Sequence, residues 1–127
     1  MERTPVMTDK APEPVGPYSQ AIRAGNWLFV SGQLPIDPKT GESASGSFER
    51  QVRRALENLK AIIEAGGSDL DRVVKVTVYL TDMERFAELN AVYDEYFGDS
   101  RPARVCIEVR DLPRGAPLEI EAIAFCD

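Results

Sequence analysis

Two strand-like runs near the C-terminal end of the chain decide the fold: RPARVCIEV at residues 101–109 and LEIEAIA at residues 118–124. A turn-forming segment, DLPRGAP at residues 111–117, separates them. In the second run Glu119 and Glu121 point to one face of a strand, while Leu118, Ile120 and Ala122 point to the other. The runs therefore predict two strands of a sheet that has one apolar face and one half-polar face.

Working outward, the N-terminal part of the chain predicts an arm followed by a hairpin. Residues 1–15 hold Pro5, Pro12 and Pro14, which favours an extended N-terminal arm whose first part is poorly ordered. We expect a single folded domain over residues 16–127. Its first elements are two β-prone runs, at residues 19–24 and 27–31, joined by Gly25-Asn26 as a tight turn.

The central part of the chain predicts two amphipathic helices. Ser47 is placed to cap the first helix, and Gly66-Gly67 ends it. A capping box at residues 81–84 opens the second helix, which stops at Gly98. Their apolar stripes, at spacings of three and four, are Phe48, Val52, Leu56, Leu59 and Ile63 in the first helix and Phe86, Leu89, Tyr93 and Phe97 in the second. Basic residues of the first helix alternate with glutamates, which is typical of a solvated face.

The order of elements predicts an α+β fold, a mixed β-sheet with two helices packed on one face. Residues 73–80 alternate as a strand between the helices, with Val74, Val76, Val78 and Leu80 expected to face one way. We expect Tyr79, Cys106 and Glu121 on the half-polar face that the helices leave uncovered. Such a face is either solvated or buried against another subunit.

Composition excludes several classes of function. The chain of 127 residues has 15 basic and 21 acidic side chains, a net charge of -6, which disfavours nucleic acid and anionic membranes as partners. No run approaches the ~18 apolar residues of a membrane span, and we expect a cytoplasmic protein. Histidine is absent, which rules out Ser-His-Asp and Cys-His catalysis and histidine-ligated zinc. The two cysteines lack metal-ligand spacing, so no metal is expected.

Arg104 and the two glutamates of the last run are the side chains best suited to chemistry. An arginine with apolar neighbours at the start of a strand can hold a carboxylate through two parallel hydrogen bonds. The alternative is an arginine that extends to water or pairs with a structural glutamate. Glu119 or Glu121, in a partly dry cleft, could position a water molecule and transfer protons, and position alone does not separate them from each other or from solvent-facing glutamates.

Three further side chains are weaker candidates. Cys106 lies two residues after Arg104 and so shares its strand face, but no histidine or lysine is identifiable as its activator, which favours a pocket-lining role. Tyr18 lies in a turn, where it could contact a ligand or pack in the loop. Asn90, on the apolar stripe of the second helix, is more often a satisfied interior amide than a ligand contact.

Several separated motifs, in order along the chain, resemble those of the RidA (YjgF-like) family. The resemblance runs from Gly16 to Ala124 and so covers nearly the whole domain. Its motifs are GPYSQA at 16–21, VSGQ at 30–33, LENL at 56–59, VKVTVYL at 74–80, the segment 90–97, PAR at 102–104 and EIEAIA at 119–124.

This resemblance implies a chorismate-mutase-like fold, a homotrimer with inter-subunit clefts, and no cofactor. It also implies hydrolysis of 2-imino and 2-enamino acids, such as 2-iminobutanoate and 2-iminopropanoate, to 2-keto acids and ammonia, an activity suited to metabolite damage control. Arg104 would then bind the substrate carboxylate, and Glu119 would orient and help activate water. The pocket would be lined by Tyr18, Ser31, Gly32, Asn90 and Cys106.

One departure from the family is Val105, where relatives often have a small hydroxylated residue; the change could remove a hydrogen bond and shift substrate preference. The alternative function is a non-catalytic trimeric protein that binds 2-keto acids in the same cleft. Ribonuclease activity, suggested for some relatives, fits badly with the net charge of -6 and the absence of histidine.

Strand geometry gives a separate reason to expect a shared site. If the last two strands pair as a direct hairpin about residues 113–115, Glu119 lies opposite Val109, five residues from Arg104 at ~3.3 Å each. One chain then could not bring both side chains to one substrate. A neighbouring subunit could, so we expect a composite cleft.

Overall fold

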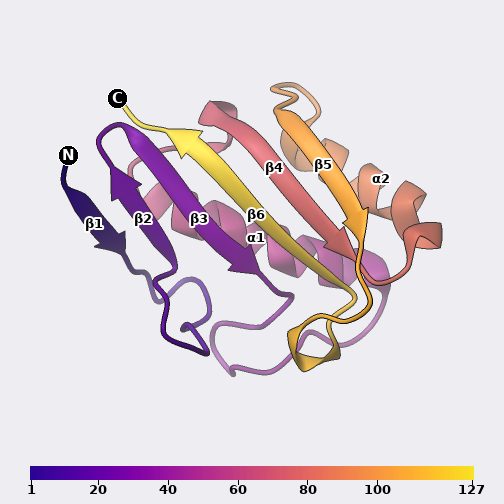
Figure 1. Cartoon of the computed structure of the whole chain (residues 1–127). Coiled ribbons are helices and arrows are strands. Elements are labelled where there is room, and N and C mark those ends of the chain that lie inside the picture. The colour runs from indigo at the N-terminus through magenta and orange to yellow at the C-terminus, as the bar shows by residue number, and fades with distance from the viewer.

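The computed structural model describes residues 1–127 as one six-stranded sheet with two helices on one of its faces (Figure 1). The strands are β1 Arg3–Val6, β2 Ala21–Ala24, β3 Trp27–Gln33, β4 Val73–Leu80, β5 Ala103–Glu108 and β6 Leu118–Phe125. The helices are α1 Phe48–Ala65 and α2 Phe86–Phe97, and three short 3-10 turns are η1 Leu70–Arg72, η2 Met83–Arg85 and η3 Pro113–Gly115. The predicted α+β class is confirmed.

The strand order, β1-β2-β3-β6-β4-β5, differs from the predicted pairing of the last two strands. β6 lies between β3 and β4, antiparallel to both, and β5 is an edge strand that pairs only with β4, in parallel. The assumed hairpin of β5 and β6 is therefore wrong. Every residue of β6 that faces the helices is a buried aliphatic residue, which suits a central strand. On β5 the corresponding face includes the charged residues Arg104 and Glu108, which suits a strand at the edge of the sheet.

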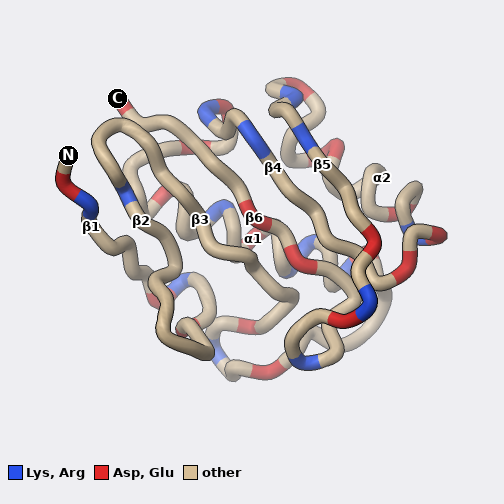
Figure 2. The backbone as a smooth tube through the Cα atoms, in the orientation of Figure 1, with Lys and Arg blue, Asp and Glu red and all other residues tan.

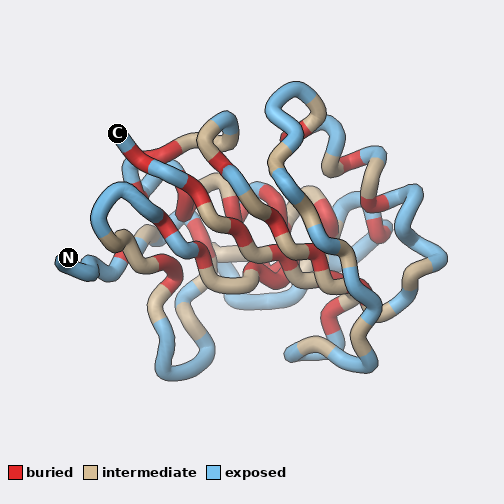
Figure 3. Tube along the Cα trace, turned by 45° about the horizontal axis from the view of Figure 1, so that its top comes forward, coloured by how far each residue is buried: buried red, intermediate tan, exposed pale blue.

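The core lies between the sheet and the two helices, where the buried residues of the central strands meet those of the helices (Figure 3). The predicted start of α1 is confirmed, because the Ser47 hydroxyl accepts a hydrogen bond from the Arg50 backbone N–H at 3.2 Å. α1 packs on β3 and β6, with Val52, Leu59 and Ile63 fully buried. Neither helix combines the length and the apolar composition that a membrane span needs.

Two strand details differ from the predictions. Residues 3–6, expected to belong to the arm, form the edge strand β1 against β2; Pro5 is tolerated there because an edge strand can spare a backbone N–H. In β4, Val74 is exposed rather than inward, because an irregularity between Val73 and Lys75 shifts the pairing with β6. Val76 and the two inward positions after it are buried as predicted.

The start of the second helix and the orientation of Cys106 also differ. The Asp82 side chain, not a capping box from Thr81, accepts the Glu84 backbone N–H at 3.0 Å and begins η2, which leads into α2. Cys106 pairs with the buried Val78, so it faces the helices and not the uncovered face. The predicted face of Cys106 was wrong, because the face depends on which strand β5 pairs with.

Candidate functional site

Arg104 is held against α2 on the helix side of the edge strand β5. Its Nη1 donates a hydrogen bond to Asn90 Oδ1 at 2.8 Å. Its guanidinium carbon lies 4.8 Å from the centre of the Tyr93 ring and 5.5 Å from that of Phe86, distances at which a cation is attracted to a ring face. None of the five ion pairs of the chain includes Arg104. The side chain is thus fixed by neutral groups, and most of its N–H donors are free for a carboxylate.

Phe86 and Tyr93 were expected only in the apolar stripe of the second helix, but they form the walls around Arg104. Their positions in the sequence contain the signal, because residues three and four apart on a helix lie on one face: Phe86 precedes Asn90 by four and Tyr93 follows it by three. The Tyr93 hydroxyl oxygen is buried without a hydrogen-bond partner, and burial raises the pKa of Tyr93 to about 12. Tyr93 therefore stays a neutral phenol beside the guanidinium.

Cys106 lies on the same face of β5 as Arg104 and packs at the edge of the core. Burial raises the pKa of its thiol, and the nearby charge of Arg104 opposes this shift. A thiol with a raised pKa is a poor nucleophile, which agrees with a lining role for Cys106. We call Asn90, Arg104 and Cys106 the Arg104 half-site.

Glu119 lies on the opposite, uncovered face of the sheet, at the wall of a pocket of about 330 Å³. Three other candidates from the sequence line the same pocket, and its residues are Val15, Tyr18, Ser31, Gly32, Leu34, Pro113 and Glu119. The Ser31 hydroxyl donates to the Ser19 carbonyl at 2.6 Å, which ties the strand β3 to the preceding loop. We call Tyr18, Ser31, Gly32 and Glu119 the Glu119 half-site.

A bulge in β3 brings Gly32 against Glu119. Three steps along β3, from Val30 to Gln33, match two steps along β6, so the strand gains one residue at this point. A Cβ atom on Gly32 would lie 2.7 Å from the Glu119 carboxyl carbon and closer still to Oε2. Only glycine leaves room for the carboxylate in this position.

The two glutamates of β6, which the sequence left unseparated, have different surroundings. Glu121 accepts a hydrogen bond from the Tyr79 hydroxyl at 2.8 Å, whereas no hydrogen bond occupies the carboxylate of Glu119. Burial, and next the charge of Glu121, raise the pKa of Glu119. Glu119 is therefore the carboxylate that is free to hold a water molecule and to exchange a proton. The acidic residues in the first half of β6 are red in Figure 2.

The two half-sites of one chain point away from each other. Arg104 pairs with Val76 of β4, which faces the helices. Glu119 pairs with Tyr79, which follows Val76 by three residues on the same strand and so faces the other way. Since side chains alternate between faces along a strand, Arg104 and Glu119 lie on opposite faces of the sheet. Val105, next to Arg104, is exposed on the Glu119 side. A single chain cannot present both half-sites to one small molecule.

Comparison with known proteins shows the family of the chain. The family described as Endoribonuclease L-PSP matches residues 8–126. The chain belongs to this family, the YjgF/RidA family. A RutC family protein of Pyrococcus horikoshii is 60% identical over 120 residues, which are 94% of this chain and 95% of that protein.

Solved structures of the YjgF/RidA family share the fold. The structure of the YjgF gene product of E. coli has a TM-score of 0.91 and 42% identity, and covers 96% of this chain and 98% of that one. The structure of E. coli TdcF with bound serine has a TM-score of 0.93 and 40% identity, and covers 98% of this chain and 99% of that one. The family thus includes a protein that binds a small molecule.

Proposed function

We propose that this RidA family protein is a homotrimer whose inter-subunit clefts hydrolyse 2-imino and 2-enamino acids to 2-keto acids and ammonia. The observation that carries the proposal is the Arg104 guanidinium, which is fixed by Asn90 and two rings but has no carboxylate partner. Such an arginine is preorganised for the carboxylate of a substrate. The serine bound to TdcF, which carries an α-carboxylate, supports this class of ligand.

The uncovered sheet face supports assembly. Large apolar side chains on this face are 38–46% exposed, and they are Trp27, Phe29, Val105, Ile107 and Phe125. An apolar face of this kind is typical of a subunit interface. When the uncovered faces pack around a three-fold axis, the β5 edge of one subunit meets the Glu119 half-site of the next. Each cleft then contains one half-site from each of two subunits.

In the proposed reaction Arg104 binds the carboxylate of the imino acid and places its C=N carbon near the neighbouring Glu119. Glu119 accepts a proton from a bound water as the oxygen attacks that carbon, and returns the proton to nitrogen. The resulting amino alcohol loses ammonia, and the 2-keto acid remains. Orientation and one proton transfer suffice, since imines also hydrolyse without a catalyst.

The test is 2-keto acid release from 2-iminobutanoate and 2-iminopropanoate generated in the cuvette by a dehydratase or amino-acid oxidase. We expect acceleration over the spontaneous rate by the wild type, and its loss in Arg104→Ala. The matched control is Arg110→Ala, because Arg110 is 98% exposed and belongs to neither half-site. Absence of acceleration by the wild type would refute the deaminase assignment, and a stable, active monomer in light scattering would refute the composite cleft.

The second candidate is a non-catalytic trimer that binds 2-keto acids, favoured by the same free guanidinium of Arg104. Glu119→Gln separates the two functions, because keto-acid binding survives in both cases while turnover falls only in an enzyme. Ribonuclease activity, which the name of the family describes, remains the poorest fit to a net charge of -6 and a chain without histidine. Incubation of the wild type with RNA checks this directly.

A further inference from the structure

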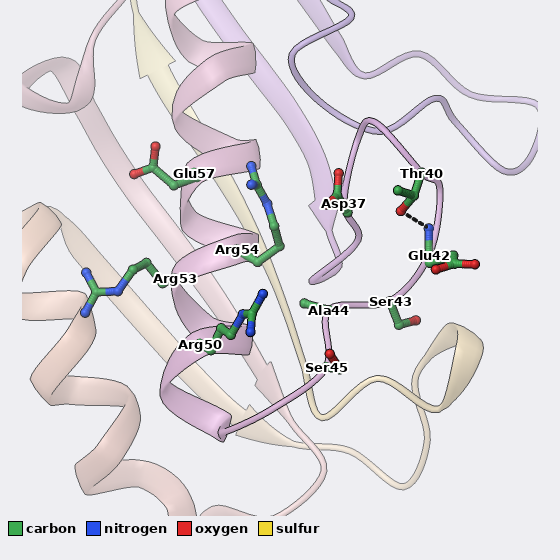
Figure 4. A pocket seen from close by; sticks show the side chains of 10 residues that line it. All are labelled: Asp37, Thr40, Glu42, Ser43, Ala44, Ser45, Arg50, Arg53, Arg54 and Glu57. Atoms are coloured by element: carbon green, nitrogen blue, oxygen red, sulfur yellow. Dashed lines mark hydrogen bonds between the residues drawn. The ribbon is translucent and has the colours of Figure 1, made fainter.

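A second pocket, of about 390 Å³, lies between α1 and the loop at residues 37–45 (Figure 4). It shares no residue with either half-site. Only one of its ten lining residues is apolar, and they are Asp37, Thr40, Glu42, Ser43, Ala44, Ser45, Arg50, Arg53, Arg54 and Glu57. Its size is in the range of small-molecule sites, and its polar lining points to a charged ligand.

Two of the three arginines at this pocket have no anionic partner. Arg53 is paired with Glu49 at 3.2 Å and with Glu95 at 3.0 Å, and in Figure 4 it turns away from the loop. Arg50 and Arg54, four residues apart on one helix face, take part in no ion pair of the chain. The solvated face expected for α1 describes the exposed Arg50 and the paired Arg53, whereas Arg54 is partly buried.

Arg54 is anchored to the protein through one nitrogen, while another of its nitrogens lacks an acceptor. Its Nη2 donates to Asn58 Oδ1 at 2.9 Å, and the buried Asn58 amide in turn donates to the carbonyls of Leu34 and Ile36 at 3.1 and 2.8 Å. The Arg54 Nε atom is buried and has no hydrogen-bond partner. A buried N–H of a charged group without an acceptor is unfavourable, so an anionic or polar group that reached Arg54 would relieve this cost.

The loop that closes the pocket is ordered by its own backbone. The Asp37 N–H donates to the Glu42 carbonyl at 2.8 Å, and the Ala44 N–H donates to the Pro35 carbonyl at 2.7 Å. The hydroxyls of Ser43 and Ser45 donate no hydrogen bond within the chain, so both are available to a ligand. The opposite wall of the pocket thus offers donors in a fixed frame.

The charges at the pocket select the ligand. Two guanidinium groups without ion pairs favour an anion, while the carboxylates of Asp37 and Glu42 at the same pocket disfavour a multiply charged one such as phosphate. The third carboxylate of the lining, Glu57, accepts the Tyr96 hydroxyl at 2.6 Å and points away from the loop in Figure 4. We propose that Arg50 and Arg54 form a binding site for a small organic monocarboxylate, distinct from the cleft of the proposed deaminase. The carboxylate meets the guanidinium of Arg54, with Arg50 and the serine hydroxyls around it.

The test is NMR of the whole assembled protein, following the ¹H–¹⁵N signal of Arg54 Nε during titration with sodium pyruvate in buffer of constant ionic strength. The protein carries Arg104→Ala, which removes the proposed deaminase cleft as a second carboxylate site. We expect a saturable shift of the Arg54 Nε signal. Inorganic phosphate should produce a weaker effect, because acidic side chains line the same pocket.

Variants at the arginines complete the test. Arg50→Gln should weaken pyruvate binding about tenfold, the effect of a lost charge-assisted contact, while leaving the Asn58 anchor in place. Arg110→Gln is the matched control and should bind as before, because Arg110 is 98% exposed and does not line this pocket. The proposal is overturned by an Arg54 signal that does not shift, by phosphate binding more tightly than pyruvate, or by equal binding in the Arg50→Gln variant. None of these results depends on turnover, so failure here leaves the proposed deaminase activity untouched.

Discussion

Replacement of Gly32 by alanine tests whether the position of the Glu119 carboxylate matters for turnover. The new Cβ atom would lie 2.7 Å from the Glu119 carboxyl carbon, against an ordinary contact of at least 3.4 Å. The carboxyl carbon must therefore retreat by about 0.7 Å, and the nearer oxygen by about 1.3 Å. A misplacement of ~1 Å can cost about 10²-fold in rate, equivalent to ~2.7 kcal/mol of transition-state stabilisation.

The same substitution should change the fold very little. Gly32 does not have a positive φ, so alanine is compatible with its backbone. The atoms that obstruct the new methyl group belong to the end of a flexible side chain, which can rotate away. We expect the free energy of unfolding in urea to change by less than about 1 kcal/mol, and the oligomeric state in light scattering to stay the same.

The assay is kcat/KM for 2-iminobutanoate generated in situ, in Gly32→Ala, Glu119→Gln and the double variant. If alanine acts by moving Glu119, it should lower activity in the wild-type background and add little to Glu119→Gln. Full activity of Gly32→Ala would show that the carboxylate position is not critical. An equal loss in both backgrounds would show that Gly32 acts on the substrate and not through Glu119.

Two further predictions concern pH and stability. Burial and the charge of Glu121 raise the pKa of Glu119, so a rate that requires ionised Glu119 should begin to fall at a pH above the usual carboxyl range. Glu121→Gln should move this acid limb of the pH–rate profile to lower pH. A limb that does not move would contradict the coupling between the two glutamates. A carboxyl whose pKa is raised by folding favours the folded state only while it is protonated. At pH 7 Glu119→Gln should therefore leave the free energy of unfolding unchanged or increase it. A clear decrease of this free energy in urea unfolding would show that Glu119 has a structural role. Asn58→Ala leaves the buried Ile36 carbonyl without a donor, while the Leu34 carbonyl keeps the Ile36 backbone N–H at 2.8 Å, and should cost about 1–3 kcal/mol in urea unfolding. The control Gln51→Ala loses one longer bond of 3.3 Å and should cost less.

The sequence by itself determined the elements whose cause is local. The Ser47 cap and apolar residues at spacings of three and four define α1, and the two-residue link at Gly25-Asn26 defines the turn between β2 and β3. These features depend on residues within one or two turns of the chain. The motifs that identified the RidA family are likewise read directly from the sequence, and they named the residues of both half-sites.

Only the tertiary structure decided which strands are neighbours and hence which face each side chain occupies. The parallel pairing of β5 with β4 places Cys106 on the helix side, and the irregularity between β4 and β6 exposes Val74. Strand pairing joins residues that are far apart in the chain, so no local pattern specifies it. The opposite orientation of Arg104 and Glu119 follows from that pairing, and it is the physical reason to expect a cleft shared between subunits.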